Sequence, residues 1–218
     1  YYLDNEICHF GQLKQGSFSS QKMEVLASID SNKRDFLKTN HTSTHLLHKA
    51  LKTVLGEEVQ QAGSLVSDNH LRFDFTYYKK VSSSELDEIE NIVNTIIRKN
   101  ISLDTKVKSF DDAKSEGALA LFGEKYEDKV RIVNVEGFSK ELCGGTHVDS
   151  TGKIGVLKII SESSLASGIR RIEALTGEKA FFYMRDQITL NNNIQNLLMC
   201  NEENILDPGE AFNLVNKI

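Results

Sequence analysis

Apolar residues recur every three to four positions in two stretches of the chain, and this spacing predicts two amphipathic helices. The first is expected to run from Asn40, as its N-cap, to Gly56, which stops it. The second begins after Ser82 and ends near Asn100, and Ser82 with Glu85 has the spacing of a capping box. In both helices the apolar residues form one stripe, so each is expected to cover a sheet.

Alternation of apolar and polar residues predicts strands between and after these helices. It is clearest in Leu71–Tyr77, which follows Val59–Val66 across the polar turn Ser67–His70, so these runs are expected to form a β-hairpin. Further strands are expected near 105–109, 130–135, 154–160 and 169–175, with a short helix near 111–117. Long helices between hairpin-joined strands are typical of the α+β class, here an antiparallel or mixed sheet with helices packed on one face.

The two ends of the chain follow different patterns. Residues 1–32 form short, glycine-punctuated runs, including an alternation over 23–29, and are interpreted as the end of a small β-domain that begins upstream. From Thr176 onward, apolar residues return at roughly heptad spacing, which predicts a long, coiled-coil-like helix leaving the domain. Because the chain starts at Tyr1 without a methionine, it is interpreted as a piece of a longer polypeptide.

Composition narrows the class of protein. Hydrophobic residues make up 39% and charged residues 26% of 218 residues, which is ordinary for a globular chain with one or two domains. The three cysteines are too few for a disulfide framework, no apolar run is long enough for a membrane span, and no signal peptide opens the chain, so a reduced, cytoplasmic setting is expected.

The net charge of −5 gives no global basic field, so any contact with nucleic acid must come from a local patch. Four lysines are candidates for phosphate contacts, although a solvated face would explain them equally well: Lys79, Lys80, Lys106 and Lys108.

Two short motifs, far apart in the sequence, supply residues that bind metals. His41 and His45 are four residues apart on the first predicted helix, so both can reach one ion from the same face. Cys143 and His147 have the same spacing and enclose Gly144-Gly145, which suits a tight loop whose backbone approaches a ligand closely. Together they offer four ligands of the types that zinc prefers, so a shared Zn²⁺ site is predicted. The alternative is a buried helix with two hydrogen-bonded histidines and an unrelated glycine turn.

Several motifs together resemble the editing domain of alanyl-tRNA synthetases. They follow one another in the order Asn40–His48, Gln60–Val66, Leu71–Phe75, Ala118–Tyr126, Glu141–His147 and Gly168–Ala174. The editing domain of threonyl-tRNA synthetases shares the two metal motifs but lacks the hairpin and Ala118–Tyr126 motifs. The resemblance implies the end of a β-barrel in residues 1–32, a zinc-containing editing domain in 33–180 and a helical, coiled-coil-like extension in 181–218.

The resemblance also implies an activity, namely hydrolysis of the ester of mischarged Ser-tRNA(Ala) or Gly-tRNA(Ala). The implied zinc ligands are His41, His45, Cys143 and His147. The implied partners are the 3′ end of the mischarged tRNA and the remaining domains of the same synthetase, with no membrane. The core that attaches alanine to tRNA(Ala) using ATP has no counterpart here, so the piece is not expected to charge tRNA. The alternatives are a free-standing AlaX-type trans-editing hydrolase and a non-catalytic, zinc-bearing tRNA-binding module.

Candidate catalytic residues are Gln61, Thr44 and Cys143. A polar group at position 61 or 44 would be satisfied by the hydroxyl of a bound serine and not by the methyl of alanine. Thr44 can equally bond to the helix backbone, and Gln61 can equally lie on the hairpin surface. Four protein ligands are typical of a structural ion, so zinc is expected to orient the substrate rather than to make hydroxide.

Candidate substrate-binding residues are Gly63, Arg170, Gly144 and Gly145. Strand alternation is expected to place Gln61, Gly63 and Leu65 on one face, with Gln61 facing the zinc cleft and Gly63 leaving room for a ligand. Arg170 falls where the family lines its pocket. Since adjacent strand residues point to opposite faces, at most one of Arg170 and Arg171 should reach the site, and ordinary surface charge is the alternative for both.

Overall fold

The computed structural model describes residues 2–3, 6–7, 10–17, 24, 26–120 and 126–197. The chain divides into two units, residues 1–30 and 31–218. In the described part of the first unit, two short strands, β1 (Tyr2–Leu3) and β2 (Glu6–Ile7), pair in antiparallel fashion. The alternation over 23–29 lies partly outside the described residues, and positions 24 and 26–29 are not in a strand. The β-barrel remnant therefore stays a prediction.

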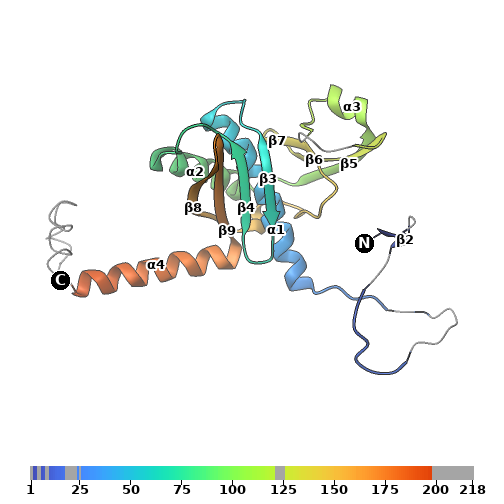
Figure 1. Cartoon of the computed structure of the whole chain (residues 1–218), viewed down its shortest axis with the longest axis horizontal. Coiled ribbons are helices and arrows are strands. Elements are labelled where there is room, and N and C mark those ends of the chain that lie inside the picture. Colours follow the sequence, from blue (N-terminus) through green and yellow to red (C-terminus); the bar gives the residue numbers. More distant parts are fainter. Residues whose placement is uncertain are drawn as a thin grey trace. The chain divides into compact units, whose positions relative to one another are not determined.

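The larger unit is built around a four-stranded antiparallel sheet in the order β3–β4–β9–β8, with α1 and α2 packed on one face (Figure 1). The bounds of these elements are α1 (Ser31–Leu55), β3 (Gln61–Val66), β4 (Leu71–Thr76), α2 (Ser83–Lys99), β8 (Leu157–Ala166) and β9 (Ile169–Thr176). Apolar side chains from both helices and from the covered sheet face form the core. Leu71, Phe73 and Phe75 are completely buried there, as the alternation along β4 predicts.

A second, three-stranded antiparallel sheet has the order β5–β6–β7. Its elements are β5 (Leu103–Ser109), α3 (Phe110–Ser115), β6 (Lys129–Val135) and β7 (Ser139–Leu142). It has a small core of its own, in which Ala113, Val130 and Leu142 are buried. The α+β class is confirmed. Both sheets are antiparallel, and the strand expected from residue 154 starts only at Leu157 because a 3₁₀ turn, η1 (Thr151–Ile154), precedes it.

Helix α1 starts nine residues before Asn40, so the predicted N-cap is wrong. The first turn, residues 31–34, is polar and mostly exposed, and apolar periodicity therefore cannot detect it. Asn40 instead lies inside the helix, 2% exposed, where its Nδ2 donates to the carbonyl of Ser67 at 2.8 Å. Its Oδ1 accepts from the hydroxyl of Thr176 at 2.7 Å. Asn40 thus ties the middle of α1 to the ends of two core strands.

The predicted helix ends are otherwise confirmed. Gly56 follows α1 with φ 123°, and Ser82 and Glu85 form a reciprocal capping box on α2. The chain's last described element is the long helix α4 (Gly177–Leu197), on which apolar side chains such as Phe181 and Ile188 are more than half exposed. Within the described residues, no helix combines the length and apolar character needed to cross a membrane.

Candidate metal centre

The four predicted ligand residues meet at one point in the larger unit. The ligand atoms of His41, His45, Cys143 and His147 all lie within 4.8 Å of one another. The Sγ of Cys143 is 3.4 Å from Nε2 of His41 and 3.4 Å from Nε2 of His147. Around a tetrahedral zinc ion, sulfur and nitrogen ligands are about 3.5 Å apart, so the two distances from Cys143 are close to those of a zinc site.

Helix α1 and the loop after β7 each provide half of the cluster. His41 and His45 lie one turn apart in the middle of α1, on the side that faces β7. The loop turns back so closely that a Cβ built on Gly145 would lie 2.5 Å from Nδ1 of His41 and closer still to Cε1. A Cβ on Gly144 would meet nothing within 4 Å. His41 therefore leaves no room for a side chain at position 145, whereas position 144 has room for one.

The loop is fixed by Arg131 on β6. Its guanidinium donates to the carbonyls of Cys143 at 3.1 Å and Gly145 at 2.5 Å. The backbone N–H of Cys143 donates in turn to the carbonyl of Arg131 at 2.9 Å. Charge-assisted hydrogen bonds of this kind are stronger than neutral ones, so the loop conformation that presents Cys143 is held from the neighbouring strand.

The three imidazoles present the same nitrogen to the cluster. His41 and His147 approach Cys143 through Nε2. The Nε2 of His45 is buried and has no hydrogen-bond partner, while its Nδ1 bonds to the carboxylate of Glu141. Nδ1 of His147 contacts the hydroxyl of Thr42 at 3.2 Å. A buried nitrogen without a partner is costly, and a metal ion at the centre of the cluster would satisfy it. The cluster can therefore bind a metal.

The electrostatics of the cluster also favour a cation. Burial raises the pKa of the Cys143 thiol, but hydrogen bonds with His147 and His41 and the nearby His45 outweigh burial and lower this pKa to about 3. Burial lowers the pKa of His45, but the nearby Cys143 thiolate and the Glu141 carboxylate outweigh burial and raise this pKa to about 10. The thiolate and the Glu141 carboxylate thus retain a proton on His45, and a metal ion would take the place of that proton.

Comparison with known proteins agrees with the motifs. A family model described as the threonyl and alanyl tRNA synthetase second additional domain matches residues 130–173, which include Cys143 and His147. The alanine–tRNA ligase of Pseudothermotoga lettingae is 50% identical over 207 residues, and that of Thermoanaerobacter sp. (strain X514) is 47% identical over 209. The ligase of Pseudoalteromonas translucida is 46% identical over 210 residues. The chain matches a fragment of alanyl-tRNA synthetase. The alignments cover 95–96% of the chain but only 23–24% of these relatives' length.

The candidate catalytic residue Thr44 lies on α1 beside His45. Its hydroxyl donates to the carbonyl of Asn40 at 2.8 Å, and the side chain is buried. Thr44 therefore bonds to the backbone of its own helix, which is the alternative given for it in the sequence analysis. A role in recognising serine stays a prediction.

A β-bulge changes the predicted orientation of Gln61. Gln61 pairs with Phe75 but Gly63 pairs with Asp74, so β3 has one extra residue between these pairs. Directly opposed side chains lie on the same face, which puts Gln61 on the core face with Phe75 and Gly63 on the opposite face with Asp74. The expectation that Gln61, Gly63 and Leu65 share one face is wrong, because alternation along the strand cannot reveal a bulge.

The amide of Gln61 is half-buried and donates to the hydroxyl of Ser64 at 3.3 Å. No hydrogen bond in the described part of the chain joins Gln61 to the four cluster residues. The orientation of Gln61 toward a substrate cleft stays a prediction.

The two adjacent arginines on β9 point to opposite faces, as predicted. Arg170 opposes Phe75 and forms a bidentate ion pair with Glu162, with N···O distances of 2.5 and 2.7 Å. Arg171 forms a similar pair with Asp74 at 2.7 and 2.8 Å. Each guanidinium is therefore already bound to a carboxylate. A substrate contact for Arg170 stays a prediction.

The candidate lysines divide into two kinds. Lys106 and Lys108 each form an ion pair with a nearby carboxylate, whereas no ion pair is seen for Lys79 or Lys80 with the described residues. Lys79, Lys80 and Lys106 are exposed, and contacts with tRNA phosphates stay a prediction.

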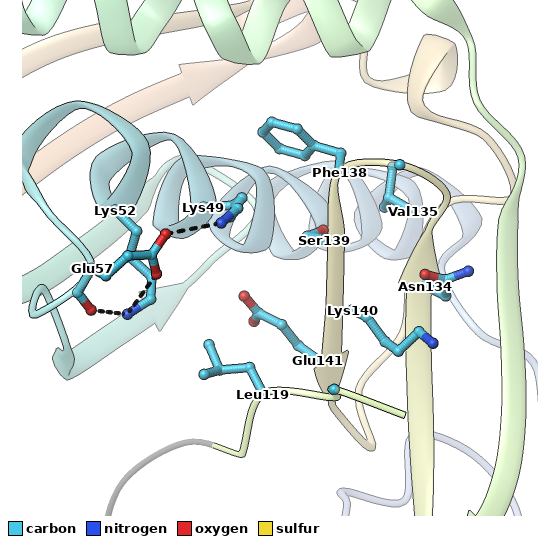
Figure 2. A pocket seen from close by; sticks show the side chains of 12 residues that line it. Lys49, Lys52, Glu57, Leu119, Asn134, Val135, Phe138, Ser139, Lys140 and Glu141 are labelled. Atoms are coloured by element: carbon cyan, nitrogen blue, oxygen red, sulfur yellow. Dashed lines mark hydrogen bonds and ion pairs between the residues drawn. The ribbon is translucent and has the colours of Figure 1, made fainter. Parts of the chain in front are cut away.

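Four residues around the cluster were not identified from the sequence: Thr42, His48, Arg131 and Glu141. Glu141 and His48 lie inside the quoted motifs, but nothing in their spacing indicates that they meet. Glu141 also lines a cavity of about 430 Å³ between α1 and the β6–β7 hairpin. Figure 2 shows this cavity, with Lys49 and Lys52 bonded to Glu57 on one side and Glu141 projecting between Leu119 and α1.

Proposed function

We propose that this chain is the editing part of an alanyl-tRNA synthetase and that it hydrolyses the ester of mischarged Ser-tRNA(Ala) or Gly-tRNA(Ala). The observation that carries the proposal is the cluster of His41, His45, Cys143 and His147 in a chain that matches a fragment of these synthetases. In the parent enzyme, other domains would attach alanine to tRNA(Ala) using ATP. The tRNA 3′ end and those domains are the proposed partners, and the cytoplasm is the proposed compartment.

We propose Zn²⁺ as the metal, because one thiolate and three imidazole nitrogens are a donor set that zinc prefers. When bound, zinc would supply a fixed positive charge that orients the substrate. The four residues fill a tetrahedral set, which favours this orienting role over the generation of hydroxide. The ester is already activated, so its hydrolysis requires mainly a positioned water and stabilisation of the developing oxyanion.

The chain's own residues would then determine substrate choice. The hydroxyl of Thr44 retains lone pairs after donating to Asn40, and the amide of Gln61 can bond to a serine hydroxyl or a ribose hydroxyl. Gly144 leaves open space beside the cluster, and Gly145 brings the loop backbone against His41. Gly63 and Arg170 complete the proposed substrate-binding residues. A site that bonds to the serine hydroxyl discriminates against alanine because the methyl leaves that polar group unpaired.

The test is a deacylation assay with Ser-tRNA(Ala), Gly-tRNA(Ala) and Ala-tRNA(Ala). Hydrolysis of the first two with Ala-tRNA(Ala) spared, and loss of hydrolysis and zinc in a Cys143→Ala, His147→Ala double variant, are the expected results. Binding of tRNA without turnover would overturn the proposal in favour of a non-catalytic module. Formation of Ala-tRNA(Ala) from ATP and alanine by the purified chain would contradict it as well.

A further inference from the structure

The carboxylate of Glu141 lies between two histidines of α1. One oxygen bonds to Nδ1 of His45, and the other lies 3.2 Å from Nδ1 of His48. Glu141 is 4% exposed, and in the part of the chain that the structure describes no lysine or arginine pairs with it. Burying a carboxylate without a permanent cation is expensive, so its position is explained by what it does for the two imidazoles.

For His45, the contact decides which nitrogen reaches the cluster. With Nδ1 bonded to Glu141, Nε2 is the nitrogen that remains for the cluster, and it is the buried atom without a partner. A carboxylate in this place fixes both the ring orientation and the proton position of a metal-binding histidine. Thr42 makes the corresponding contact with Nδ1 of His147.

His48 in turn holds Glu141. It follows His45 by three residues on α1, so both rings lie on the same helix face. It is 3% exposed, and its ring lies against Phe73, with centroids 5.3 Å apart. Because His48 occupies the second oxygen, the carboxylate cannot rotate away from His45 without losing a buried hydrogen bond.

We propose that Glu141 is a positioning residue of the metal centre, that it presents Nε2 of His45 to the ion, and that His48 locks Glu141 in this orientation. The inference rests on the proposed metal site. It assigns to Glu141 and His48 no contact with the metal or the substrate.

The test compares zinc affinity, by competition with a chromophoric chelator, in Glu141→Gln, His48→Phe and wild-type chains. Glutamine keeps the size of the side chain but offers one acceptor and one donor, so one imidazole loses its acceptor. We expect the zinc dissociation constant to rise about 10–100-fold, with a changed visible spectrum of the Co²⁺-substituted chain. His48→Phe should raise the constant by less, below about tenfold. Glu136→Gln, the same change at an exposed residue, is the matched control and should leave it unchanged.

Thermal melting of the metal-free chains separates positioning from folding. A purely structural role would lower the melting temperature but leave zinc affinity and the Co²⁺ spectrum of the folded chain as in the wild type, and this result would overturn the proposal. If Glu141→Gln does not fold, the test rests on His48→Phe. A wild-type zinc affinity in that variant would contradict the proposal that His48 locks Glu141 in place. A wild-type chain that binds no zinc would instead overturn the metal site itself, independently of the variants.

Discussion

The two halves of the metal centre are built in different ways. On α1, the helical repeat places His41 and His45 on one side, and Glu141 from β7 then bonds to Nδ1 of His45. In the loop after β7, Cys143 and His147 depend on contacts from elsewhere, namely Arg131 from β6 and Thr42 from α1. The helix half therefore places its ligands by regular secondary structure and needs a tertiary contact only to orient His45, whereas the backbone of the loop half is itself held by tertiary contacts. Variants of the loop and its supports should harm metal binding more than changes in the anchoring of the helix.

The largest effect is expected from Gly145→Ala. The added methyl would overlap His41, so either the loop or this ligand must move out of the cluster. Loss of a ligand should exceed the roughly 10–100-fold loss of affinity that is usual for outer-shell changes. Gly144→Ala is the matched control, since its methyl meets open space and should change zinc affinity little. Chelator competition measures both, and equal losses in the two variants would contradict the close approach of Gly145 to His41.

The two halves should also differ in their response to pH. The pKa of His45 is raised to about 10, so below that pH zinc must displace a proton from the helix half. The pKa of Cys143 is lowered to about 3, so the loop thiol is already ionised near neutrality. Zinc affinity should therefore rise with pH, by about tenfold per unit between pH 7 and pH 8.5, where one proton is released per ion. Chelator-buffered titrations at several pH values check this, and a flat profile would show that His45 carries no such proton.

A smaller effect is expected from Thr42→Val. The hydroxyl contacts Nδ1 of His147 at 3.2 Å and accepts from the N–H of Val148 at 3.2 Å. Valine has a similar shape but leaves both groups without this partner, which should lower zinc affinity about tenfold and destabilise the chain by about 1–3 kcal/mol. Thr53→Val, at an exposed position on the same helix, is the control, and similar losses there would mean that helix propensity and not the loop contact is responsible.

The smallest effect on the metal is expected from Asn40→Ala. Asn40 anchors the helix half to Ser67 and Thr176, and within the described residues its side chain forms no hydrogen bond with a ligand side chain. Removing it leaves buried partners unsatisfied and should lower the free energy of unfolding by about 1–3 kcal/mol. Zinc affinity measured on the folded chain should change by less than about twofold. A large loss of affinity at unchanged stability would show that the position of the helix half also depends on the anchor at Asn40.

The contrast between local structure and tertiary contacts also separates the features that could be predicted from the sequence from those that could not. Periodicity identified both core helices, the hairpin of β3 and β4, and the i, i+4 pair on α1, because these depend on interactions between near neighbours in the chain. It failed at the start of α1, where polar residues continue the helix without an apolar stripe, and at the bulge in β3, where one extra residue reverses the face of Gln61.

The sequence by itself determined the fold class, the long helices and the four residues that can bind a metal, since spacing and residue type carry that information. Only the tertiary structure decided how the ligands are held. Glu141 meets His45 and His48 across more than 90 positions of sequence, with separations of 96 and 93 residues. Arg131 reaches the glycine loop because β6 and β7 pair, and Gly145 is required because His41 lies against it. Such contacts join segments whose approach is set by the packing of the core, and no local pattern of residues records them.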